Sequence, residues 1–184
     1  SRDALVPNIP GLTRDRQYVD LDAHGRRIIV VDTGGLSGQE EGIDSEMARQ
    51  SLAAIAECDL ALVLVDARAG VTPADQRILA LLRTSGKPFL LVVNKIDGTD
   101  EPLASAEFHE LGAPERYVFA GFPGGKLIAV SAAHGRNMGR LERALLAALP
   151  QPGVPEEEAE PEADARVRVA VVGRPNVGKS TLVN

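Results

Sequence analysis

The chain has 184 residues, a net charge of −6 and one cysteine, Cys58. This length suits one well-filled domain better than two. The acidic balance gives no global basic surface for nucleic acid, and a single cysteine forms no internal disulfide. No apolar run approaches the ~18 residues of a membrane span. We therefore expect a cytoplasmic protein without a membrane segment.

The N-terminal third combines an irregular start with a hairpin. Prolines and a glycine within residues 1–18 rule out a regular helix there, and Thr13 is the notable polar side chain. The alternating patterns at 18–22 and 26–31 predict two paired strands. A D-x-x-G sequence follows at 32–35, where Asp32 ends the second strand and the glycines permit close approach of the backbone to a ligand.

The middle of the chain alternates strands and helices. Continuous apolar runs at 60–65 and 89–93 predict strands buried on both faces of a parallel sheet. Helices are expected over residues 45–58, 72–84, 102–112 and 137–149, and a last strand over 126–130. This alternation predicts a doubly wound α/β sheet, with ligand-binding groups at the carboxyl ends of its strands. Two sequences lie at such ends: Asn94-Lys95-Ile96-Asp97 and Ser131-Ala132.

The last residues carry the clearest motif. A β-branched run at 166–172 enters Gly173, four further residues and Gly178-Lys179-Ser180, which matches G-x-x-x-x-G-K-[ST]. In such a loop the backbone N–H groups wrap phosphates, the lysine reaches their oxygens and the serine holds Mg²⁺. The helix that opens at Lys179–Thr181 adds its unpaired N–H groups. The alternative is an ordinary glycine-rich turn.

Together, the phosphate loop, D-x-x-G, N-K-x-D and Ser131-Ala132 resemble the GTPase motif set. Residues 1–6, 10–15, 32–35, 66–70 and 173–182 narrow the resemblance to the tandem-GTPase family EngA, also called Der. The resemblance implies a Ras-like P-loop GTPase fold, a mostly parallel sheet with helices on both faces. It also implies hydrolysis of GTP to GDP, Mg²⁺ as cofactor, and a role in ribosome biogenesis through the large ribosomal subunit and its rRNA.

The same resemblance assigns roles to single residues. Asn94 and Asp97 would bind guanine, the carboxylate accepting from two N–H donors that adenine does not present together. Lys95 would pack beside the base or ribose, and the Ala132 N–H would meet the guanine oxygen. Catalysis would involve Lys179, Thr13 and Gly35, Mg²⁺ would be held by Ser180, Thr13 and Asp32, and the remaining nucleotide-binding residues would be Gly173, Asn176, Val177, Gly178, Thr181 and Ser131.

Two features concern turnover. Leu36 stands where Ras-like enzymes have a water-orienting glutamine, so we expect slow intrinsic hydrolysis. Asn176 matches an asparagine that lets related GTPases use K⁺, although it can equally serve to shape the loop. A guanine-nucleotide-binding module without useful turnover is therefore the alternative to an enzyme. A weaker alternative is an interaction protein that uses its acidic linker, and an ATPase would leave the N-K-x-D motif without a purpose.

The order of the motifs divides the chain. Residues 1–149 resemble a first G domain without its initial strand and phosphate loop, 150–165 form an acidic Pro/Glu-rich linker, and 166–184 resemble the start of a second G domain. The chain thus looks like an internal fragment of such a protein. A linker of sixteen residues extends to ~50 Å, so we expect 166–184 to fill the central place of the sheet, in its own chain or in a strand-swapped dimer. Residues 118–125 resemble an insertion without an assigned role.

Overall fold

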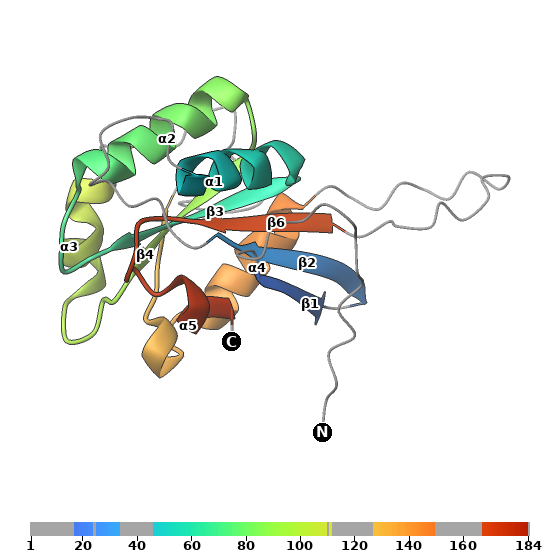
Figure 1. Ribbon diagram of the computed structural model, residues 1–184. Coiled ribbons are helices and arrows are strands. Elements are labelled where there is room, and N and C mark those ends of the chain that lie inside the picture. The colour runs from blue at the N-terminus through green and yellow to red at the C-terminus, as the bar shows by residue number, and fades with distance from the viewer. Residues whose placement is uncertain are drawn as a thin grey trace, which may run out of the picture.

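The computed structural model describes residues 17–23, 25–33, 46–109, 111, 127–149 and 167–183. In these residues one six-stranded sheet runs in the order β1-β2-β6-β3-β4-β5, with helices on both faces (Figure 1). β1 is antiparallel to β2, and every other neighbouring pair is parallel. The strands are Gln17–Ala23 (β1), Arg26–Asp32 (β2), Leu60–Asp66 (β3), Phe89–Asn94 (β4), Leu127–Ala129 (β5) and Val167–Val172 (β6). The predicted α/β sheet is confirmed.

The helices follow the predicted segments closely, with one exception. They are Glu46–Glu57 (α1), Pro73–Ser85 (α2), Glu101–Ser105 (α3), Met138–Ala148 (α4) and Lys179–Val183 (α5), with 3-10 turns at Ala106–His109 (η1) and Ala132–His134 (η3). The single helix predicted over 102–112 was wrong. The Ser105 hydroxyl donates to the Glu101 carbonyl at 2.7 Å, a type of bond that bends helices, and the chain tightens into η1, where Phe108 is fully buried.

α2 shows how local sequence sets the ends of a helix. Thr72 lies at the N-cap, its hydroxyl accepts from the Asp75 N–H at 3.3 Å, and the Asp75 carboxylate accepts from the Thr72 N–H at 3.0 Å. Gly86 ends the helix with φ of 69°, a left-handed conformation that favours glycine. This capping box fixes the start of α2 without help from the rest of the fold.

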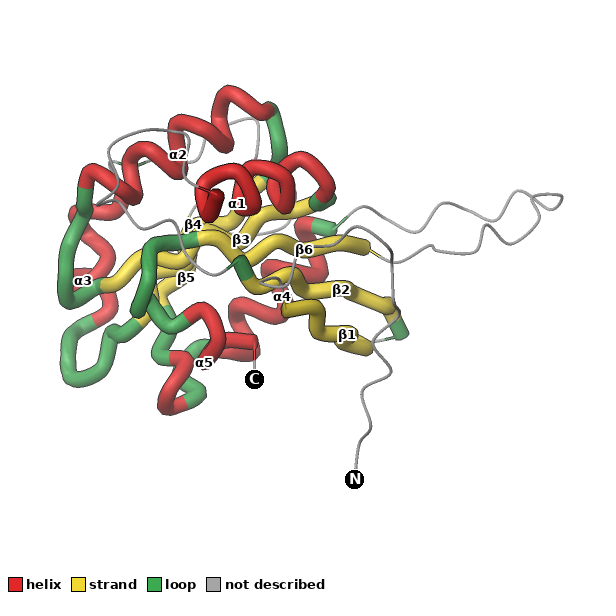
Figure 2. The backbone as a smooth tube through the Cα atoms, viewed as in Figure 1, coloured by secondary structure: helices red, strands yellow, loops and turns green. Residues whose placement is uncertain are grey.

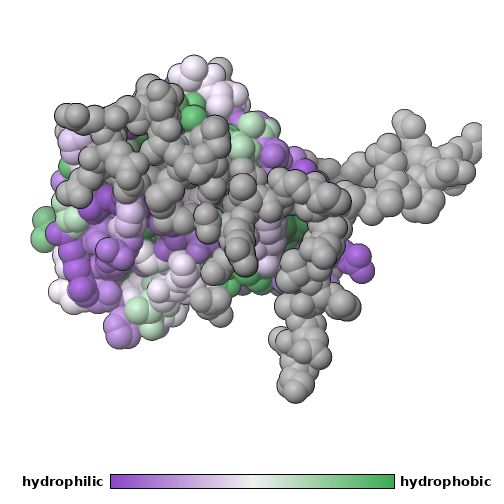
Figure 3. All heavy atoms as spheres, viewed as in Figure 1, coloured by the Kyte–Doolittle hydropathy of each residue, from purple (hydrophilic) through white to green (hydrophobic). Residues whose placement is uncertain are grey.

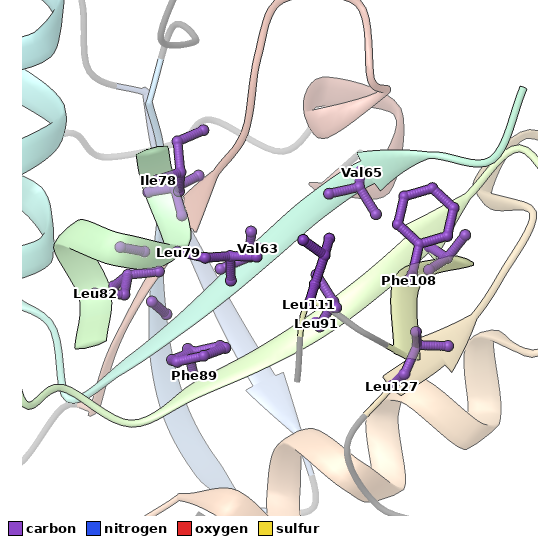
Figure 4. Close-up of a cluster of buried hydrophobic side chains, with 14 of the residues drawn as sticks. Val63, Val65, Ile78, Leu79, Leu82, Phe89, Leu91, Phe108, Leu111 and Leu127 are labelled. Carbon is purple, nitrogen blue, oxygen red and sulfur yellow. The ribbon is translucent and has the colours of Figure 1, made fainter. Parts of the chain in front are cut away.

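Two hydrophobic layers enclose the sheet. α1, α2 and η1 cover one face, and α4 and α5 cover the other (Figure 2). On the first face Leu79 and Leu82 of α2 lie near Val63 and Phe89 of the strands (Figure 4). Phe108 of η1 lies farther along the same face, beside Val65 and Leu127. On the second face Leu141 and Ala144 of α4 pack with alternate residues of the same strands. The central strands are therefore buried on both sides.

The C-terminal strand β6 occupies the centre of the sheet. It pairs in parallel with β2, where Val169 lies opposite Val30, and with β3, where Val169 lies opposite Leu60. Side chains 169–172 are fully buried; Ala170 and Val172 belong to one layer, and Val169 and Val171 to the other. The expectation that the C-terminal segment fills the central place is confirmed, and it does so within one chain.

On the face that Figure 3 shows, hydrophilic side chains make up much of the surface that is not drawn in grey. Among the described residues the large exposed hydrophobic side chains are Tyr18, Leu21 and Leu103. No helix in this part of the chain combines the length and apolar character that crossing a membrane requires.

Replacing Val171 with alanine tests the position of β6. The valine is fully buried between β2 and β3, so the loss of two methyl groups should lower the free energy of unfolding by about 2 kcal/mol. Arg168→Ala, at an exposed position of the same strand, should change it by less than about 0.5 kcal/mol. Urea unfolding followed by circular dichroism measures both. Equal effects of the two substitutions would contradict a buried β6.

Candidate nucleotide-binding site

The phosphate loop leaves the carboxyl end of β6 and leads directly into α5. Lys179, the first residue of α5, is buried, and its Nζ donates to the carbonyls of Gly173 at 3.2 Å and Arg174 at 3.0 Å. Burial lowers the pKa of Lys179, and the nearby Asp32 carboxylate opposes this shift. The loop therefore encloses a desolvated ammonium group, which an anion in the loop would stabilise.

Two positions of the loop require glycine, because atoms of neighbouring strands lie too close for a side chain. A Cβ at Gly173 would lie 2.5 Å from the Leu64 carbonyl oxygen of β3. A Cβ at Gly178 would lie 2.5 Å from Asn94 Nδ2, and its φ of 95° is one that side-chain-bearing residues rarely adopt. The glycines of the motif thus let the loop sit directly against β3 and β4.

Asp32 and Ser180 form a pair suited to a divalent cation. The Ser180 hydroxyl donates to Asp32 Oδ2 at 2.8 Å, joining residues 148 positions apart. Asp32 is 7% exposed, and its Oδ1 is buried without a hydrogen-bond partner. A buried carboxylate oxygen with spare capacity beside a hydroxyl fits Mg²⁺, which takes oxygen ligands and often uses one protein carboxylate together with substrate phosphates.

Thr33 attaches the D-x-x-G segment to β6. Its hydroxyl donates to the Val171 carbonyl at 2.8 Å, and its backbone N–H donates to the same oxygen at 3.3 Å. Thr33 is buried, so both bonds are shielded from water. The position of Thr33, directly after β2, is therefore set by the C-terminal strand.

Asn94 connects three loops through its side chain. Its Nδ2 donates to the Val177 carbonyl of the phosphate loop at 2.8 Å, and its Oδ1 accepts from the Ala132 N–H at 3.0 Å. Asn94 is buried, so these bonds lie in a low dielectric. Contacts of Asn94 and Ala132 with guanine remain predictions, since both groups are used within the protein here.

Lys95 makes a second connection to the phosphate loop. Its Nζ donates to Asp66 Oδ2 at 2.8 Å and to the Asn176 carbonyl. Lys95 and Asn176 have φ of 67° and 64°, both left-handed. The backbone of Asn176 thus has a role in shaping the loop, and its side chain is exposed.

Asp97 presents a partly buried carboxylate at the far end of the N-K-x-D motif. The Ser131 hydroxyl donates to Oδ1, Arg68 Nη2 lies 3.3 Å from Oδ2, and His134 Nε2 lies 3.7 Å from Oδ1. The Ser131 hydrogen bond is the main cause that lowers the pKa of Asp97, with smaller contributions from His134 and Arg68. The carboxylate is therefore ionised and oriented toward donors.

The structure brings most of the predicted residues to one edge of the sheet. The residues at or next to the carboxyl ends of β2, β4, β5 and β6 are Asp32, Asn94, Lys95, Asp97, Ser131, Ala132, Gly173 and residues 176–181. Val177 contributes its carbonyl, while its side chain is fully buried. Thr13, Gly35, Leu36 and residues 118–125 lie outside the described residues, as does the linker 150–165.

Sequence reasoning gave no role in the site to Asp66, Arg68, Asp75 or Arg174. Asp66 lies opposite Asn94 at the end of a buried strand, so the rule that identified Asp32 also points to it. Arg68 and Arg174 follow strands in loops without a periodic pattern, and Asp75 shows only its capping signal. Their contacts come from the fold. In the described part of the chain no group of three or more His, Cys, Asp or Glu residues is placed to hold a metal ion.

Comparison with known families gives a match over more than half of the chain. The family model described as 50S ribosome-binding GTPase matches residues 1–95 and 168–184. The chain is 52% identical over 184 residues to GTPase Der of Teredinibacter turnerae, covering 37% of that protein. It is 50% identical to GTPase Der of Cellvibrio japonicus, covering 36%. The chain spans a little more than a third of the length of these curated relatives.

Solved structures share the fold. An Era variant from Aquifex aeolicus bound to GDP.AlF4⁻ superposes with a TM-score of 0.60 at 24% identity, covering 79% of this chain and 49% of that one. Era in complex with MgGDPNP and a segment of 16S ribosomal RNA superposes with a TM-score of 0.57 at 27% identity, with the same coverage.

Ser131→Ala tests the electrostatics of Asp97. Loss of the hydroxyl removes the main cause of the lowered pKa, so the Asp97 pKa should rise toward 3.8, and His134→Ala should raise it less. A carboxyl group whose pKa is lower in the folded state than in the unfolded state stabilises the fold at pH values above the unfolded-state pKa. This stabilisation is lost as the pH falls through the folded-state pKa. The stability difference between wild type and Ser131→Ala should therefore be full at pH 6 and narrow below about pH 4.

A ¹³C NMR titration of the Asp97 carboxyl measures these pKa values, and thermal unfolding at each pH measures the stability difference. A larger rise in His134→Ala than in Ser131→Ala would contradict the assignment.

Proposed function

Because the chain belongs to the 50S ribosome-binding GTPase family, we propose that it binds GTP and hydrolyses it to GDP and phosphate. The observation that carries the proposal is the convergence of Lys179, Ser180, Asp32 and Asn94 on one edge of the sheet. The Ser180–Asp32 hydrogen bond joins the end of β2 to the start of α5, 148 positions apart in the sequence. The related Era structures contain GDP.AlF4⁻ and MgGDPNP, which supports a guanine nucleotide here.

Guanine would be selected by Asp97. An ionised carboxylate accepts two hydrogen bonds, and guanine presents a ring N–H and an exocyclic amine side by side, whereas adenine does not. The Ser131 hydroxyl holds one carboxylate oxygen, and Arg68 approaches the other. Guanine would displace Arg68, which is 63% exposed and returns to solvent at little cost.

The phosphates would lie in the loop of residues 173–178. Lys179 would transfer its N–H donors from the Gly173 and Arg174 carbonyls to phosphate oxygens. Ser180 and Asp32 would hold Mg²⁺, which neutralises phosphate charge when bound. Thr13 and Gly35 are proposed to close over the γ-phosphate and the metal by the same family resemblance.

The wider biological role follows from the family. We propose that residues 1–149 form a first G domain, 150–165 a linker and 166–184 the start of a second G domain, and that the parent protein acts in biogenesis of the large ribosomal subunit, with rRNA as a partner. The description of the matching family, 50S ribosome-binding GTPase, supports this role. The pairing of β6 within its own chain favours a complete site in one copy, and a strand-swapped dimer is the second arrangement that preserves the same pairings.

Steady-state phosphate release tests the activity. The wild-type chain should release phosphate from GTP in Mg²⁺, slowly because Leu36 replaces the water-orienting glutamine. If Asn176 helps to hold K⁺, the rate should be higher in K⁺ than in Na⁺, and equal rates would remove that role. GTP binding without phosphate release would identify the alternative, a nucleotide-binding module.

Asp97→Asn tests base recognition. Two hydrogen bonds to a charged acceptor are worth ~1.5–3 kcal/mol each, so GDP affinity should fall at least about hundredfold. Asp100→Asn is a matched control, because Asp100 is exposed and makes no side-chain capping bond at the start of α3. Calorimetric titration with GDP measures both. An unchanged GDP affinity in Asp97→Asn would overturn the assignment of Asp97.

A further inference from the structure

Asp75 is a fully buried acid with one oxygen unused by its own helix. Its Oδ2 accepts from the Thr72 N–H at 3.0 Å and from the Thr72 hydroxyl at 2.6 Å, which completes the capping box of α2. Its Oδ1 is buried and has no hydrogen-bond partner. Capping of α2 therefore accounts for Oδ2 of Asp75, whereas Oδ1 takes no part in it.

The unused oxygen faces the phosphate loop. Arg174, the second residue of that loop, places its Nε 3.8 Å from Asp75 Oδ1. Its Nε and Nη2 are buried without hydrogen-bond partners, although the side chain as a whole is 23% exposed. The buried atoms without hydrogen-bond partners thus face each other, Oδ1 of the carboxylate and Nε of the guanidinium, and each group compensates the charge of the other.

The backbone of Arg174 also belongs to the site. Its carbonyl accepts from Lys179 Nζ at 3.0 Å, so the residue that contacts α2 through its side chain contacts the phosphate-binding lysine through its main chain. Asp75 and the start of α2 are held in place by further hydrogen bonds. The capping box holds Asp75, and Glu107 Oε2 accepts from the Val71 N–H at 3.4 Å just before the helix.

We propose that Arg174 is a positioning residue of the phosphate loop, fixed to α2 by the buried Asp75 carboxylate, an inference that rests on the proposed nucleotide site. Arg174 does not itself reach the base side of the site, which Asp97 and Ser131 form. Its loss changes the binding of phosphates and leaves the choice of base unaltered. α2 thus acts as the rigid support from which the first turn of the phosphate loop is held.

A double-mutant cycle on the full chain tests this inference. Arg174→Met removes the charge but keeps length, and Asp75→Asn keeps an acceptor for Thr72 but turns an amide group toward Arg174. Each should weaken GDP binding about tenfold, because coupled buried pairs interact by ~0.5–3 kcal/mol, and the double variant should lose no more than either single one. Arg77→Met, exposed on the same helix, is the matched control and should bind GDP as wild type does.

Two readouts separate positioning from a general loss of stability. The ³¹P signal of the β-phosphate of bound GDP should move in Arg174→Met and stay in place in Arg77→Met. The preference for GDP over ADP should be retained in Arg174→Met, in contrast to Asp97→Asn. If Arg174→Met does not fold, Arg174→Lys takes its place and should weaken GDP binding about threefold, since lysine lacks the planar fork of arginine.

The outcomes distinguish the two proposals. Binding of GDP by wild type with unchanged affinity in the Arg174 and Asp75 variants overturns the positioning role alone. Losses that add in the double variant also overturn it, because the two residues would then act independently. Absence of GDP binding by the wild-type chain overturns the proposed function itself.

Discussion

The parallel pairing of β6 with both β2 and β3 is the interaction on which the other features depend. A strand in the middle of a sheet satisfies its own backbone groups and those of two neighbours, whereas an empty place there would expose two unpaired edges. The four fully buried residues 169–172 also contribute alternately to the two hydrophobic layers. Both cores and the sheet therefore close only when the C-terminal strand is in place.

The site follows from the same placement. The central strand delivers its loop between the ends of β2 and β4, where Asp32 meets Ser180 and Asn94 meets the Val177 carbonyl. These bonds lie between segments that are far apart in the sequence, and most are buried or partly buried. A nucleotide that binds the completed edge binds the folded chain alone, so its binding would stabilise the pairing of β6 as well.

The polar side chains at this edge of the sheet have different structural roles. Asn94 and Lys95 connect the N-K-x-D segment to the phosphate loop, and Arg174 connects that loop to α2. Asp97 remains accessible at the other end, where the hydrogen bond from Ser131 keeps it ionised. Hydrogen bonds and an ion pair thus hold the phosphate loop, while Asp97, proposed to bind the base, keeps part of its carboxylate exposed.

The sequence by itself determined the strands and the phosphate loop, because each rests on a local pattern: apolar or alternating runs for the strands and glycine spacing for the loop. It also indicated the predicted site residues at the ends of strands, since the carboxyl ends of parallel strands share one edge. It did not reveal the short α3, where Ser105 and the burial of Phe108 override helix propensity. Nor did it determine whether β6 pairs within its own chain, or that Arg174 faces Asp75. Those contacts join residues about a hundred positions apart, and only the tertiary packing of the sheet brings them together.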